Sequence, residues 1–98
     1  MVTQDLLGKV TFAFCRPSAH QVNVTGEFNN WKLQPMKKNG RYWSISMHLK
    51  PGTYQFMYVA DGEWFPDYAA NGLVESPFGR NSIVVVQHRL INQLPYCE

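Results

Sequence analysis

The sequence holds little charge and no long apolar run. Charged residues make up 16% of the 98 residues, and nine Lys and Arg against seven Asp and Glu leave a net charge of +2. The largest basic cluster is Lys37-Lys38, whereas nucleic-acid-binding proteins usually carry a basic stripe. No apolar run approaches the ~20 residues that span a bilayer. We therefore expect neither a nucleic acid partner nor a membrane.

Cysteines are also few. Cys15 and Cys97 are the two in the chain, and no CxxC motif is present. Disulfides are rare in cytosolic proteins, which favours two reduced thiols, although a bridge between the ends of the domain stays open. The first residues lack the basic start and apolar stretch of a secretory signal. Together these absences predict a cytoplasmic protein.

The usual signatures of catalysis and metal binding are missing. The sequence has no GxSxG, P-loop or GxGxxG motif. Three histidines are isolated, without a second ligand at metal-binding spacing: His20, His48 and His88. Four acidic residues are expected in loops: Glu27, Asp61, Glu63 and Asp67. A glycosidase needs two carboxylates that flank a groove, which a domain of this size rarely supplies. We expect no metal, no cofactor and no catalysis.

Alternation with a period of two is abundant, by contrast. Apolar and polar residues alternate in four segments, 10–14, 22–25, 42–49 and 54–60, and 83–86 is a continuous apolar run. Asn39-Gly40 and Asp61-Gly62 are typical of two-residue hairpin loops. No helical stretch of ten residues is present. Short strands with turns between them indicate an all-β fold, either a β-sandwich or a small barrel.

The length supports one domain, 1–98, with a sandwich over about 9–88 and a tail over 89–98. Residues 67–80 are expected to form a 14-residue loop, and loops of this length are often functional. In the tail, Leu90, Ile91 and Leu94 suit one helical turn or a contact with a protein partner.

Aromatic residues are numerous, with three Trp, five Tyr and six Phe. Trp43 shares a strand face with apolar residues and is expected in the core. Trp31 follows a strand end and Trp64 follows a hairpin turn, where burial is difficult. A flat indole covers the C–H face of a glucose ring at low entropic cost, and Arg80 and Asn81 offer donors for its hydroxyls. Sugar binding is the hypothesis, although an isolated Trp in a β protein belongs more often to the core.

Four motifs, in order and at sensible spacing, resemble carbohydrate-binding module family 48. They occupy residues 26–31 (GEFNNW), 49–54 (LKPGTY), 61–67 (DGEWFPD) and 78–86 (FGRNSIVVV). This family includes the glycogen-binding domain of the AMP-activated protein kinase β subunit and the early-set domains of glucan branching and debranching enzymes. The similarity runs from about residue 9 to 87.

The resemblance implies an immunoglobulin-like, early-set antiparallel β-sandwich. It also implies non-catalytic binding of α-1,4-linked glucans, such as glycogen, starch and maltooligosaccharides, and targeting of the module or a partner to the polysaccharide. Trp31 and Trp64 match the stacking residues, Phe78 the loop residue that reaches over the sugar, and Asn81 the hydroxyl-binding residue. Met57 stands where the family has a sugar-contacting lysine, and it cannot donate a hydrogen bond. This departure predicts a weaker affinity.

Rim contacts are expected from three further side chains, Glu27, Lys32 and Arg80. Early-set domains of glucan enzymes often keep the fold without a competent binding face. The alternative is therefore a structural or protein-interaction module with an idle sugar face. Such a module would act through its tail or through an exposed sheet edge.

Overall fold

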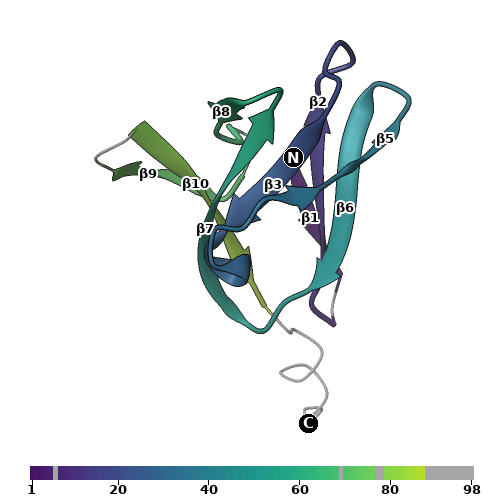
Figure 1. Cartoon of the computed structure of the whole chain (residues 1–98). Coiled ribbons are helices and arrows are strands. Elements are labelled where there is room, and N and C mark those ends of the chain that lie inside the picture. The colour runs from purple at the N-terminus through teal and green to yellow at the C-terminus, as the bar shows by residue number, and fades with distance from the viewer. Residues whose placement is uncertain (6, 69, 77–78, 88–98) are drawn as a thin grey trace, which may run out of the picture.

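The computed structural model describes residues 1–5, 7–68, 70–76 and 79–87, and they form two antiparallel sheets packed face to face (Figure 1). The elements in chain order are β1 (Val2–Gln4), β2 (Lys9–Cys15), β3 (Val22–Gly26), the 3-10 turn η1 (Glu27–Asn29), β4 (Gln34–Pro35), β5 (Lys37–Asn39), β6 (Tyr42–His48), β7 (Gly52–Ala60), β8 (Glu63–Phe65), β9 (Gly72–Ser76) and β10 (Gly79–Val86). Within these ranges no helix is long and apolar enough to cross a membrane.

The smaller sheet has the strand order β1-β2-β6-β5. The larger sheet has the order β4-β3-β7-β10-β9, and β8 also pairs with β7. Every strand pairing is antiparallel. The predicted all-β antiparallel sandwich is confirmed.

The core lies between the sheets and follows from the alternation. Its fully buried aromatic centre is formed by Phe12 on β2 and by Phe56 and Tyr58 on β7. The Phe12 and Phe56 rings meet edge to face, with centroids 5.0 Å apart, a favoured arrangement for aromatic pairs. Trp43 is buried as expected, and its Nε1 donates to the carbonyl of Arg16 at 3.0 Å.

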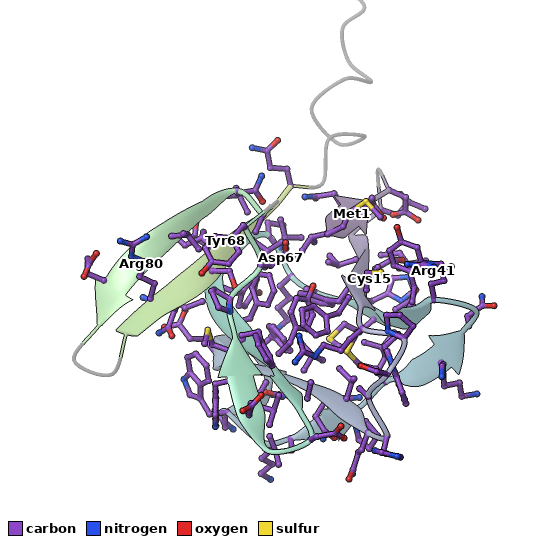
Figure 2. All side chains as sticks on the ribbon, turned by 90° about the horizontal axis from the view of Figure 1, so that it is seen from above. Met1, Cys15, Arg41, Asp67, Tyr68 and Arg80 are labelled. Carbon is purple, nitrogen blue, oxygen red and sulfur yellow. The ribbon has the colours of Figure 1, made fainter. Side chains whose placement is uncertain are left out.

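One polar network crosses this core. The hydroxyl of Tyr58 donates to Oδ2 of Asp67 at 2.7 Å, and the Asp67 amide donates to Oγ of Ser82 at 3.1 Å. Burial, together with the hydrogen bond to the Asp67 carboxylate, raises the pKa of Tyr58 well above its ordinary value. Figure 2 shows Asp67 in the interior of the sandwich, where it is 5% exposed. Asp67 lies in a loop, as expected, although its side chain is buried. Glu63, by contrast, lies in β8, so the loop expected at that residue is wrong.

The expected long loop at 67–80 is also wrong. Residues Gly72–Ser76 form β9 and pair with the start of β10, from Gly79 opposite Ser76 to Ile83 opposite Gly72. A continuous apolar run such as 83–86 is typical of a strand covered on both faces. Instead it alternates, because Val84 and Val86 are buried whereas Ile83 and Val85 are half-buried. The tail and Cys97 lie outside the described residues, and Cys15 is exposed.

Both predicted hairpins are present. Asp61 and Gly62 have φ of 49° and 85°, and they join β7 to β8 as a two-residue loop. In the hairpin of β5 and β6 the loop is Gly40-Arg41, one residue later than expected, because Asn39 already pairs with Tyr42. Positive φ then falls on Gly40 alone of this pair.

Candidate functional site

The larger sheet turns one face away from the core, and we call it the outer face. On β3 and β7 it carries Asn23, Thr25, Gln55, Met57 and Val59, since these residues alternate with the core residues of the two strands. The register sets Asn23 opposite Val59 and Thr25 opposite Met57. This face continues onto β10, where Ile83 is opposite Gln55.

Trp64 stands at one end of the outer face. Strand β8 sets it opposite Val59, and directly opposed residues share a face in an antiparallel pair. Val59 is only 6% exposed although it points away from the core, whereas Trp64 is 54% exposed. The indole therefore covers the valine on one side and faces solvent on the other.

The hairpin that carries Trp64 is anchored by Asp61. Its carboxylate accepts hydrogen bonds from the backbone amides of His20, at 3.0 Å, and Gln21, at 2.9 Å. The hydrogen bond from His20 and the one from Gln21 lower the pKa of Asp61. A loop about forty residues earlier in the chain thus holds the Trp64 turn in place.

Trp31 follows the turn at the end of β3, which is packed too tightly for any side chain at Gly26. A Cβ there would lie 2.5 Å from the carbonyl oxygen of Gln55 and 2.8 Å from Cβ of Phe56. Oδ1 of Asn29 accepts from the Gly26 amide at 3.0 Å. Oε1 of Glu27 accepts from the backbone amide of Gln55 at 2.7 Å. These contacts fix η1 against β7.

The backbone at Trp31 itself is strained. Asn30 and Trp31 have φ of 57° and 60°, and the Trp31 amide donates to the Gly26 carbonyl at 2.8 Å. Asn tolerates this left-handed region, whereas for a bulky residue it is an outlier. Such strain is retained where surrounding contacts enforce it, often at functional sites. The Trp31 side chain is 39% exposed.

Met57 points away from the core, as expected from its place between Phe56 and Tyr58. It is 9% exposed and its neighbour Thr25 is fully buried, so other side chains cover this part of the outer face. The Thr25 hydroxyl has no hydrogen-bond partner among the described residues. Met57, Thr25 and Val59 therefore form a covered floor on the outer face rather than an open contact.

Asn81 and Gln55 form an amide pair beside this floor, in which Nδ2 of Asn81 donates to Oε1 of Gln55 at 2.9 Å. Arg80 alternates with Asn81, so it projects to the other side of β10, and its Nε lies 3.4 Å from Oε2 of Glu75. Figure 2 shows Arg80 over β9 and β10, on the same side of the molecule as Tyr68. Lys32 is exposed beside Trp31.

One predicted site residue, Phe78, lies outside the described residues, and one residue of the outer face was missed by the sequence analysis. Gln55 was not predicted for the site, although its alternation with Phe56 is visible in the sequence and places it on the outer face. No group of three metal-ligating side chains occurs within the described ranges.

Comparison with known proteins identifies the family of this sandwich. Residues 9–91 match the family described as the glycogen recognition site of AMP-activated protein kinase. The chain belongs to this family. It is thus a member of the glycogen-recognising carbohydrate-binding modules, and the resemblance inferred from the four motifs is confirmed.

Relatives of this glycogen-recognition module occur in plants, animals and fungi. The chain is 36% identical over 72 residues to "Protein PTST homolog 2, chloroplastic" of Arabidopsis thaliana, covering 70% of this chain and 13% of that protein. It is 29% identical over 68 residues to the human 5'-AMP-activated protein kinase subunit beta-1, covering 68% of this chain and 25% of that subunit. The subunit beta of Schizosaccharomyces pombe is 33% identical over 49 residues, half of this chain and 16% of that protein. The module therefore spans only a small part of these relatives.

Proposed function

We propose that the outer face binds an α-1,4-linked glucan of the glycogen or starch type, with the indoles of Trp31 and Trp64 stacking on its glucose rings. The observation that carries the proposal is the contrast among the three tryptophans. Trp43 is 8% exposed and serves the core, whereas Trp31 and Trp64 are 39% and 54% exposed on turns that other segments hold rigid. Two exposed indoles held on rigid turns supply flat apolar surfaces of the kind that stack on sugar rings.

The spacing of the two turns favours an oligosaccharide over a single sugar. Trp64 adjoins Val59, and the turn of Trp31 begins at Gly26, opposite Phe56. Val59 and Phe56 are three residues apart on β7, which corresponds to about 10 Å along the strand. This distance exceeds the width of one glucose ring, so a chain of several units is needed to reach both indoles.

The polar groups near the floor suit the edge of a sugar chain. The Asn81–Gln55 hydrogen bond leaves one N–H of Asn81 and the Gln55 amino group able to donate to hydroxyls. A neutral glucan needs no charged partner, which agrees with a floor made of Met57, Thr25 and Val59. Aromatic stacking on two platforms predicts a Kd between about 1 mM and 1 µM.

The module acts as a binding domain without catalysis, and the acidic residues support this proposal. Glu27 accepts from the Gln55 amide, Asp61 from His20 and Gln21, and Asp67 from Tyr58. Each carboxylate thus holds the fold. In the cell the module would attach itself or a partner protein to the polysaccharide, and the cytoplasmic location expected from the sequence stays a prediction.

The test is a titration with maltoheptaose, followed by the NMR signals of the three indole N–H groups. The signals of Trp31 and Trp64 should shift while that of buried Trp43 stays unchanged. Trp31→Ala and Trp64→Ala should each lower the affinity at least tenfold. Tyr42→Ala is the matched control, because Tyr42 is 46% exposed on the other sheet. An unchanged spectrum at millimolar sugar, with the protein folded, would reject the proposal.

A further inference from the structure

The edge of the smaller sheet contains a groove that the glucan proposal does not use. It has a volume of about 520 Å³, and its lining includes Pro35, Lys37, Lys38, Ser44, Ile45 and Ser46. It exists because the chain changes sheets just before β5. Met36 donates its amide to Val22 on the larger sheet, whereas Lys37 already pairs with Ser44 on β6. Beyond Ser44, β6 therefore has no strand on this side within the described ranges (Figure 1).

The backbone groups that face this free edge can be assigned. Leu49 donates its amide to Gly8, on the side of β2. Backbone groups alternate in direction along an antiparallel strand, so the odd-numbered residues of β6 point to β2 and the even-numbered residues point to the opposite edge. Ser44 uses its groups on β5. Ser46 and His48 consequently present N–H and C=O groups outward, and Ser46 presents them into the groove.

The side chains around the edge are basic. No acidic residue occurs between Glu27 and Asp61, a stretch that contains Lys32, Lys37, Lys38, Arg41 and Lys50. None of the ion pairs within the described ranges involves Lys37 or Lys38. Lys38 is held over the Trp43 ring and donates to the carbonyl of Pro17 at 3.0 Å. Lys37 is exposed. It lies directly opposite Ser44 of β6, so the two side chains project from the same face of the sheet.

We propose that this groove docks an extended acidic segment of a partner protein, which adds to β6 as a further strand. Strand addition supplies main-chain hydrogen bonds, and alternate side chains supply specificity. Lysines at a free edge oppose pairing with a second copy of the same edge, because like charges would face each other. The same lysines attract an acidic strand. This inference does not depend on glucan binding, which uses the other sheet.

The side-chain alternation of β6 defines the sequence of such a segment. Ser44, Ser46 and His48 lie on the solvent side, together with Lys37, whereas Ile45 and Met47 pack toward the core. A partner strand would therefore place acidic residues on the solvent side, near Lys37. Its alternate residues would be apolar and would extend the apolar surface formed by half-buried Ile45 and exposed Pro35. The pattern is acidic–apolar–acidic opposite the free part of β6, from Ser46 to His48.

The probe is a nine-residue peptide of alternating Glu and Val with blocked ends, added to ¹⁵N-labelled protein. Amide shifts should concentrate at Lys37–Asn39 and at residues 44–48, and hydrogen exchange at Ser46 and His48 should slow. Binding should weaken in high salt. Lys37→Glu should weaken it about fivefold, in line with one exposed charge pair. The same variant should keep its affinity for maltoheptaose, which shows that it remains folded.

Two control peptides separate strand addition from charge attraction. Replacing each Glu by Lys should abolish binding. Methylating alternate backbone nitrogens should abolish it as well, since the main-chain hydrogen bonds are then lost. Equal binding of the lysine peptide, unchanged binding after methylation, or no saturable shift at millimolar peptide would each overturn the proposal. The last result would mean that the lysines only protect the edge from self-association.

Discussion

Replacing Gly26 by alanine tests how the Trp31 turn is built. Gly26 has φ of −174°, an extended conformation that any residue adopts, so the change adds no backbone strain. The obstacle is space. The new methyl group would lie 2.5 Å from the Gln55 carbonyl oxygen and 2.8 Å from both the Phe28 ring and Cβ of Phe56. Two of these three contacts are with backbone or a Cβ atom, which cannot move away without shifting β7 or η1.

The expected cost follows from overpacking, which typically destabilises a protein by about 1–3 kcal/mol. For a domain of this size that is a fall in Tm of roughly 4–20 °C, at about 4–8 °C per kcal/mol. Because β3 and β7 must separate at Gly26, where η1 begins, the Trp31 turn should shift as well, and the affinity for maltoheptaose should fall together with the stability. Thermal unfolding and a sugar titration measure the two effects on the same sample.

Gly40→Ala is the matched control. Gly40 has φ of 66°, and nothing lies within 4 Å of the added Cβ, so the change introduces strain without a clash. It should cost roughly 1 kcal/mol and leave glucan binding unchanged, since Gly40 lies in the hairpin of β5 and β6. The reasoning about Gly26 is refuted if Gly26→Ala is no less stable than Gly40→Ala, or if it binds maltoheptaose like the unmodified protein.

Three further predictions concern the polar contacts. Tyr58→Phe removes the hydroxyl that donates to buried Asp67 and should destabilise the protein by about 1–3 kcal/mol in urea unfolding, without changing the affinity for glucan. Gln55→Met removes the acceptor that orients the Asn81 amide, so the affinity for maltoheptaose should fall about fivefold, or about 1 kcal/mol, at unchanged Tm. Backbone hydrogen bonds lower the pKa values of Asp5 and Asp61 below 3.8, so their contribution to stability is present above that pH and is lost as the pH falls through the lowered values. The urea midpoint should therefore decline below about pH 4, and Asp61→Asn should flatten that decline; an identical pH profile for the variant would contradict the role of Asp61.

The sequence was sufficient to predict the strands that build the core. The segments that became β2, β3, β6 and β7 alternate over at least four residues, which indicates a buried face, and β10 contains the continuous apolar run 83–86. Strands β1, β4 and β5 have two or three residues and lie at sheet edges, where no alternation can develop. Strand β9 begins with Gly72, and its sequence GLVES does not alternate clearly. Its pairing with β10 depends on tertiary context rather than on local preference.

The candidate site was predictable in part for a similar reason. Trp64 could be placed near solvent because Asp61-Gly62 fixes a two-residue turn just before it. The left-handed backbone of Trp31 could not be predicted, because it depends on contacts between η1 and β7, more than twenty residues away in sequence. Burial of Asp67 likewise depends on contacts with Tyr58 and Ser82. Ser82 precedes the apolar run 83–86, so the sequence did not indicate that it belongs to a strand.

The acidic residues support the proposed binding role of the outer face. A carboxylate that acts as an acid or a nucleophile must face the substrate with a lone pair available. Here the carboxylate of Glu27 accepts a hydrogen bond from the backbone amide of Gln55, and the carboxylate of Asp61 accepts one from the backbone amide of His20. They are thereby used to hold Trp31 and Trp64 in position before any ligand arrives. Such preorganisation lowers the entropic cost of binding, which would favour the proposed stacking of a neutral glucan that offers no charge to attract.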